Sequence, residues 1–122
     1  MSEILFRGKD VYGKWLYGDL INLTSEIKQI CNHTQLEHAH GVNPETVGQF
    51  INRTDKKGKK IFVGDIVKYS NGEIGVIRYN ENVSAYIVDF GGGDWDYLDV
   101  ENGTGEVIGN IHDNPELLEV QK

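Results

Sequence analysis

The stretch that decides the fold is Val63-Gly64-Asp65-Ile66-Val67, and its pattern recurs at three other places in the chain. Each copy places a glycine and a polar residue between an apolar residue and one or two aliphatic residues. Glycine adopts backbone conformations that other residues avoid, and the polar side chain can hydrogen-bond to nearby amides. We therefore expect structural turns, each feeding a strand, at Gly18 and Asp19, Gly48 and Gln49, Gly64 and Asp65, and Gly109 and Asn110.

Short stretches rich in apolar residues separate these turns and indicate β-strands. The expected strands are Ile4–Arg7, Trp15–Leu23, Glu26–Cys31, Val47–Ile51, Ile61–Tyr69 with a turn at Gly64 and Asp65, Glu73–Tyr79, Ala85–Phe90, Trp95–Val100 and Glu106–Ile111. The 15 glycines and only 2 prolines of the chain suit the many tight turns of such a protein. Asn71-Gly72 is the strongest hairpin signal, since both residues tolerate the left-handed conformations of a two-residue turn. Near residue 115, Pro115 fits the first turn of a helix, and Leu117 and Leu118 offer an apolar side. The sequence predicts an all-β fold, a small barrel of short antiparallel strands with one short C-terminal helical turn.

The length and composition are those of an ordinary globular protein. A chain of 122 residues supports one compact domain. No apolar run approaches the roughly 20 residues of a membrane-spanning helix, and no basic and apolar leader opens the chain. Cys31 is the single cysteine, so no internal disulfide can form, which agrees with a reducing compartment. We expect a cytoplasmic protein that makes no membrane contact.

The net charge of -7 is unevenly distributed along the chain. Residues 1–78 contain eleven basic and nine acidic residues, whereas residues 79–122 contain ten acidic residues and only Lys122 as a basic one. The two parts therefore carry +2 and -9, which sum to -7. An acidic last third repels phosphate backbones, so binding to nucleic acid is possible but not favoured.

Five blocks of sequence carry a resemblance to a known family. They are Phe6-Arg7-Gly8-Lys9-Asp10, Trp15-Leu16-Tyr17-Gly18-Asp19-Leu20, Thr46-Val47-Gly48-Gln49-Phe50, residues 55–67 and residues 107–118. In this order the chain resembles the YopX family of phage and prophage proteins over nearly its whole length. The resemblance implies one YopX-like domain over residues 1–122, in which residues 24–46 form a variable loop or hairpin. It also implies an SH3-like barrel or roll in a bacterial host cell, a tendency to oligomerise, and no catalytic residues to carry over.

Cys31, His33, His38 and His40 form the most tempting cluster for a metal. Thiolate and imidazole groups are good zinc ligands, and a hairpin could bring the four side chains together. Their spacing matches no known pattern of zinc ligands, however. We therefore favour a polar loop with incidental histidines and expect no metal or other cofactor, and a metal-binding protein stays an alternative.

The basic residues Arg53, Lys56, Lys57, Lys59 and Lys60 are candidates for contact with a partner. A lysine-rich turn also stays solvated and discourages edge-to-edge pairing of strands, which is the simpler interpretation. A stacking platform for single-stranded nucleic acid would need aromatic residues among the lysines, and this run has none. The run in one subunit could instead meet the acidic last third of another subunit in a head-to-tail oligomer.

Two groups of side chains complete the functional expectations. Alternation places Trp95 and Tyr97 inward and Asp94, Asp96 and Asp99 in water, and these aspartates do not have the spacing of a calcium loop. No serine or histidine is spaced to pair a nucleophile with a base. The aromatic residues are expected mostly in the core, namely Trp15, Tyr17, Phe50, Phe62, Tyr69, Tyr79, Tyr86 and Trp95.

The expected function follows from the predicted fold, the family resemblance and the candidate sites. We expect a noncatalytic phage or prophage accessory protein, an oligomeric β-barrel that binds an unknown phage or host protein. A nucleic-acid-binding SH3-like barrel is the first alternative, because such barrels serve many functions. A metal-binding protein that uses Cys31 and the three histidines is the second.

Overall fold

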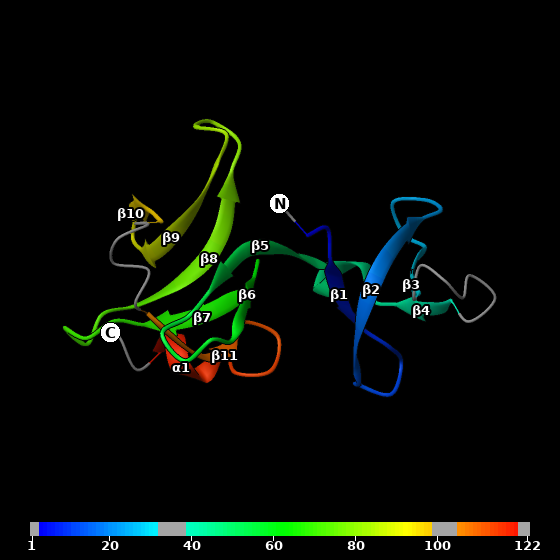
Figure 1. The fold of residues 1–122 in the computed structure, drawn as a ribbon, viewed down its shortest axis with the longest axis horizontal. Helices are drawn as coiled ribbons and strands as arrows, with labels where there is room; N and C mark the ends of the chain where they lie inside the picture. The colour runs from blue at the N-terminus through cyan, green and yellow to red at the C-terminus, as the bar shows by residue number, and fades with distance from the viewer. Residues whose placement is uncertain (1–2, 32–38, 99–104, 120–122) are drawn as a thin grey trace. The chain divides into compact units, whose positions relative to one another are not determined.

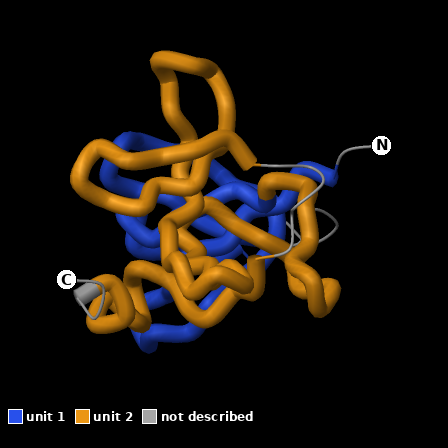
Figure 2. Tube along the Cα trace, turned by 90° about the vertical axis from the view of Figure 1, so that its left-hand side faces the viewer, with its two compact units in different colours: residues 1–50 blue, residues 51–122 orange. Residues whose placement is uncertain are grey.

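The computed structural model describes residues 3–31, 39–98 and 105–119. The chain divides into two compact units, residues 1–50 and residues 51–122, which Figure 2 shows in different colours. Each unit is described by itself. A single domain over residues 1–122 stays a prediction.

The first unit is an antiparallel sheet of short strands. The strand order is β4 (His40–Val42), β3 (Lys28–Cys31), β2 (Trp15–Asn22) and β1 (Phe6–Lys9), and the start of β5 (Gly48–Thr54) pairs with β1. A short 3-10 helix, η2 (Pro44–Thr46), precedes β5. The predicted loop or hairpin at residues 24–46 thus contains the pair β3 and β4, and residues 32–38 lie outside the described part.

The second unit contains a five-stranded antiparallel sheet and two further strand segments. The sheet order is β10 (Asp94–Tyr97), β9 (Ala85–Gly91), β8 (Ile74–Asn80), β7 (Asp65–Lys68) and β11 (Glu106–Asn110). The later residues of β5 also belong to this unit, where its neighbour is β6 (Lys60–Phe62). Figure 1 shows β8 and β9 as a long, curved hairpin. One buried cluster forms the core of the unit, namely Ile51, Ile61, Val67, Ile77, Val88 and Val107.

The predicted all-β class is therefore confirmed, as is the short C-terminal helical turn. The helix α1 (Glu116–Glu119) has four residues, and the N–H of Leu118 donates to the carbonyl of Pro115 at 3.1 Å. Within the described residues, no helix has the length and apolar character needed to cross a membrane. The SH3-like barrel stays a prediction.

The recurring glycine pattern lies in four different structural settings. Gly64 lies in the turn between β6 and β7, and Asp65 begins β7. Gly48 and Gln49 begin β5, whereas Gly109 and Asn110 end β11. The side-chain oxygen of Asn110 then accepts the N–H groups of the following turn, from His112 and Asp113. The pattern thus occurs before a strand or after one, since the Asp65 carboxylate accepts the N–H of Phe62 before it, whereas Asn110 accepts from residues that follow it.

Gly18 and Asp19 correct the turn prediction, because β2 continues through them without interruption. A Cβ atom at Gly18 would clash with the carbonyl oxygen of Cys31 on the paired strand β3. The glycine is therefore required by the close approach of a neighbouring backbone, and a turn is not needed to explain it.

Three hairpins share one five-residue turn, with first residues Asp10, Asp55 and Tyr69. In each, the N–H of the first residue donates to the carbonyl of the fifth at 2.8 to 2.9 Å, and a glycine at the fourth position donates back to the first. These glycines are Gly13, Gly58 and Gly72, with φ of 80°, 84° and 91°. The two-residue turn predicted at Asn71-Gly72 is therefore wrong, because three residues form the loop and only the glycine of that pair is left-handed.

Candidate functional site

Two of the four proposed metal ligands lie in the described part of the chain. Cys31 ends β3 and is buried, while His40 begins β4, is exposed and lies opposite Ile30. His33 and His38 lie outside the described residues. Residues 3–31, 39–98 and 105–119 contain no group of three or more side chains placed to hold a metal ion.

The basic run is partly engaged inside its own chain. Arg53 is half-buried in β5, and Lys56, Lys57, Lys59 and Lys60 are exposed. The Lys57 ammonium lies 2.9 Å from the carboxylate of Glu106, and that of Lys56 lies 3.9 Å from it. The hydrogen bond between Lys57 and Glu106 raises the pKa of the lysine and lowers the pKa of the glutamate. Part of the positive charge is thus already matched by an acidic residue from the last third of the chain.

Asp55 organises this region, and sequence reasoning missed it. One carboxylate oxygen, Oδ1, accepts the N–H groups of Lys57 at 2.9 Å and Lys59 at 2.8 Å. The other, Oδ2, accepts the N–H of Val107 at 3.0 Å. The N–H of Lys56 donates to the carbonyl of Gly105 at 3.3 Å. We call this arrangement of residues 55–59 with residues 105–107 the Asp55 clasp.

The ionisation of Asp55 reflects two opposing effects. Burial of the side chain raises its pKa, because an apolar environment disfavours the charged form. The three backbone N–H groups that donate to the carboxylate, with the nearby positive charge of Lys59, stabilise the charged form. The net effect is a pKa below the ordinary value, so Asp55 is a buried and ionised structural residue.

A second feature is the face of the sheet that points away from the core. Tyr86, Val88 and Phe90 of β9 pack in or against the core cluster. Because successive side chains of a strand point to opposite faces, Ile87 and Asp89 lie on the other face. Strand pairing places Arg78 beside Ile87, Trp95 beside Asp89, and Tyr97 beside Ile87. We call this surface the outer face, formed by Arg78, Ile87, Asp89, Trp95 and Tyr97, although Ile87 itself is buried beneath its neighbours.

The outer face exposes aromatic rings that were predicted to be buried. Trp95 is 37% exposed and Tyr97 is 53% exposed, and their rings meet edge to face with centroids 5.3 Å apart. The alternation was read correctly, since the two share a face, but the inward prediction is wrong. Leu98 packs against the core cluster, which leaves Trp95 and Tyr97 on the opposite side of an edge strand. Other aromatics expected in the core divide as well, with Phe50 and Phe62 buried and Tyr17 and Tyr79 exposed.

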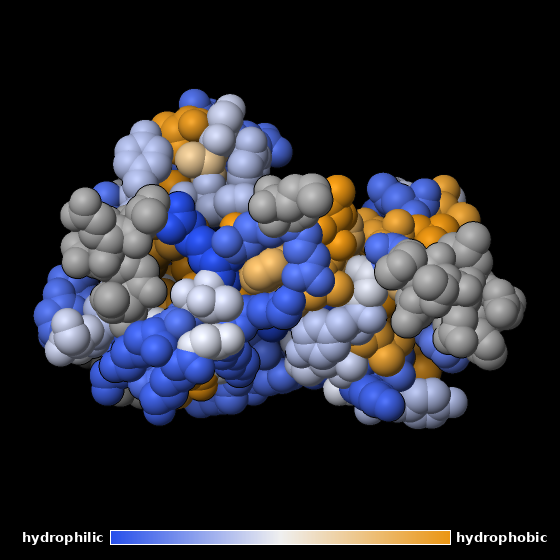
Figure 3. Space-filling model, in the orientation of Figure 1, coloured by the Kyte–Doolittle hydropathy of each residue, from blue (hydrophilic) through white to orange (hydrophobic). Residues whose placement is uncertain are grey.

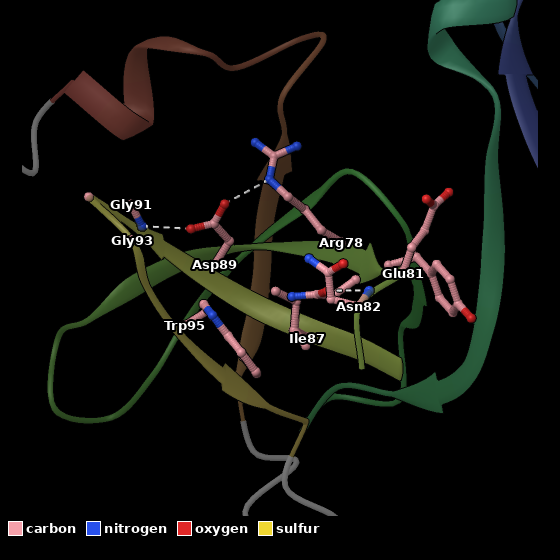
Figure 4. A pocket seen from close by; sticks show the side chains of 11 residues that line it. Arg78, Glu81, Asn82, Ile87, Asp89, Gly91, Gly93 and Trp95 are labelled. Carbon is pink, nitrogen blue, oxygen red and sulfur yellow. Dashed lines mark hydrogen bonds and ion pairs between the residues drawn. The ribbon is translucent and has the colours of Figure 1, made fainter. Parts of the chain in front are cut away.

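A shallow hollow of about 550 Å³ lies on the outer face. Figure 4 shows Arg78 and Asp89 side by side within it and Trp95 nearby. The Arg78 guanidinium donates to Asp89 at 3.0 Å, and the other carboxylate oxygen of Asp89 accepts the N–H of Gly91 at 2.9 Å. Glu81 also lines the hollow. The surface therefore combines a fixed ion pair, an aromatic ring and one further acidic residue, a composition suited to binding.

The space-filling view shows the surface of the second unit from one side. In Figure 3 the second unit presents a largely hydrophilic surface, and hydrophobic colour gathers at the end of the β8 and β9 hairpin. The sequence did contain a signal for the outer face. The alternation Tyr86, Val88, Phe90 marks the inner side of β9 and thereby assigns Ile87 and Asp89 to the other side.

Over nearly its whole length the chain matches one protein family. The model of one family, described as YopX protein, matches residues 5–119. The curated proteins compared with the chain include no match.

Proposed function

The chain belongs to the YopX family, and on that basis we propose that it is a noncatalytic accessory protein of a phage or prophage that binds a partner protein through its outer face. The observation that carries this proposal is the pair of exposed rings, Trp95 and Tyr97, on the same face of the sheet as Arg78. Tryptophan, tyrosine and arginine are the residues most enriched among the energetic centres of protein interfaces. A solvent-exposed surface that gathers all three supports a protein partner.

The arrangement of charge favours a protein over a nucleic acid as the partner. Arg78 is already paired with Asp89, and Glu81 lines the same hollow. A phosphate backbone would meet the carboxylate of Glu81 here, which opposes binding. A partner with a polar or basic surface around an apolar centre matches the hollow better.

We also propose that the protein acts in the cytoplasm of a bacterial host and assembles as an oligomer of SH3-like barrels. Charge between subunits is one source of such assembly, because the last third of the chain is strongly acidic. Lys56 and Lys57 already contact Glu106 of their own chain, so Lys59 would carry a larger share of any head-to-tail contact. Light scattering after chromatography at low and high salt tests this part, and a monomer at both would contradict it.

Site-specific photocrosslinking in cells tests the outer face. A benzophenone amino acid replaces Tyr97 in one variant and Ile27 in a control variant, and both positions are about equally exposed, at 53% and 54%. We expect a discrete crosslinked protein from position 97 in infected or prophage-induced cells, and its loss when Trp95→Ala is added. Equal crosslinking from both positions, or none from position 97, would contradict the proposal.

A further inference from the structure

Two turns of this protein are nearly identical in hydrogen bonding, although they lie in different units. They are Asp10-Val11-Tyr12-Gly13-Lys14, between β1 and β2 in Figure 1, and Asp55-Lys56-Lys57-Gly58-Lys59. Asp10 accepts the N–H groups of Tyr12 and Lys14 at 2.9 Å each, as Asp55 accepts those of Lys57 and Lys59. Corresponding side-chain to backbone distances in the two turns agree within about 0.1 Å. The two aspartates therefore hold their turns in the same way.

The turn at Asp55 has a second function, because it holds an extended strand. Oδ2 of Asp55, which makes no bond within the turn, accepts the N–H of Val107. The N–H of Lys56 donates to the carbonyl of Gly105. Between these two contacts, the side chain of Glu106 meets Lys56 and Lys57 at the tip of the turn. Gly105 and the first two residues of β11 are thus recognised by an amide, two side chains and a carboxylate oxygen.

The turn at Asp10 presents the same groups, and none of the described residues occupies them as residues 105–107 occupy the Asp55 turn. Within the described part of the chain, Oδ2 of Asp10 and the N–H of Val11 have no hydrogen-bond partner. The two tip side chains, Val11 and Tyr12, are 89% and 90% exposed. These two side chains present apolar surface that contact with a partner would remove from water.

We propose that the Asp10 turn binds an extended segment of a partner protein, as the Asp55 turn binds residues 105–107. The segment would donate one backbone N–H to Oδ2 of Asp10 and accept a hydrogen bond from the N–H of Val11. Its middle residue is apolar, because Val11 and Tyr12 stand where Lys56 and Lys57 meet an acidic side chain. This site lies in the first unit and is independent of the outer face.

The third turn of this type shows that the backbone conformation does not require an aspartate. It runs from Tyr69 to Glu73 and has the same backbone hydrogen bonds, but its first residue has no carboxylate. The proposal therefore rests on Asp10 and the two tip residues, and not on the shape of the backbone alone.

A synthetic peptide provides the test with the full-length protein. The probe is a blocked hexapeptide with the sequence of residues 104–109 that carries E106L, and a matched control peptide is N-methylated at the residue equivalent to Val107. Amide shifts of ¹⁵N-labelled protein are followed during titration into the millimolar range. We expect saturable shifts at Val11 and Tyr12 with the probe and at least about 10-fold weaker binding of the methylated peptide, because the charge-assisted hydrogen bond is lost.

The substitution Asp10→Asn is the decisive variant. Its side-chain oxygen can still accept the two turn amides, so the turn is retained, but an NH₂ group replaces the oxygen that would receive the peptide. We expect binding to weaken by about 10-fold or more in this variant. Unchanged binding to Asp10→Asn, shifts confined to residues of the Asp55 clasp, or no saturable shift at all would each overturn the proposal.

Discussion

The backbone N–H of Val107 donates to the carboxylate of Asp55 across 3.0 Å, joining residues 52 positions apart in the chain. The contact is buried and adds the third N–H donor to one carboxylate. It connects the turn after β5 to β11, which is the last strand of the second unit.

Asp55→Asn should destabilise the protein although the change is almost isosteric. The new NH₂ group would face the N–H of Val107, so two donors would meet in a buried place. We expect a loss of about 1–3 kcal/mol in the free energy of unfolding, measured by urea denaturation. Asp10→Asn is the matched control, since its turn has no third donor among the described residues, and a change within about 0.5 kcal/mol is expected. Equal effects of the two substitutions would contradict the role of Val107.

The same carboxylate predicts a dependence of stability on acid. The folded protein lowers the pKa of Asp55 below its ordinary value of 3.8, so the native state favours the ionised form. This stabilisation is fully present above the unfolded pKa and is lost as the pH falls through the lower folded pKa. The stability difference between the wild-type protein and Asp55→Asn should therefore be constant near neutral pH and shrink below about pH 4. A difference that grows on acidification would disprove this assignment.

Gly18→Ala tests the close approach of β2 and β3. The added Cβ atom would clash with the carbonyl oxygen of Cys31, and this backbone atom cannot move without disturbing the strand pair. We expect a loss of about 1–3 kcal/mol in thermal or urea unfolding. Gly41→Ala in β4 is the control, because a Cβ atom there meets nothing within 4 Å. The explanation fails if both variants are equally stable.

Tryptophan fluorescence tests the orientation of β10. The protein has two tryptophans, and Trp95 is 37% exposed while Trp15 is half-buried. Trp15→Phe leaves Trp95 as the emitter, and its emission should lie at longer wavelength and be quenched by acrylamide more strongly than that of Trp95→Phe. If Trp95 were the less accessible residue, β10 would turn its aromatic side toward the core.

The sequence allowed the strands to be located because their signal is local. Apolar stretches between turn residues place β1, β2, β5, β7, β8, β9 and β11 close to their observed positions. Whether a copy of the glycine pattern forms a turn or continues a strand depends instead on residues that are distant in the sequence. The chain continues as one strand through Gly18 because β3 lies against it, whereas it turns at Gly64 between β6 and β7. Similar segments thus have different structures because their neighbours differ.

The functional residues divide in the same way. The charged turn at residues 55–60 was recognised, but its partner Glu106 follows about 50 residues later and no local pattern links the two. The inward prediction for Trp95 and Tyr97 was wrong because alternation shows which residues share a face and not which face meets the core. The repeated Asp-x-x-Gly-Lys at residues 10–14 and 55–59 was visible in the sequence, and its meaning required the hydrogen bonds of both turns.

The position of β11 beside β7 has a consequence for synthesis of the protein. During translation β7 emerges nearly 40 residues before its outer neighbour, so its edge stays unpaired while the nascent chain grows. An unpaired edge is a template for association with other chains. A ribosome that stalls before Glu106 would therefore release a fragment prone to aggregate, and complete translation is what protects the cell from it.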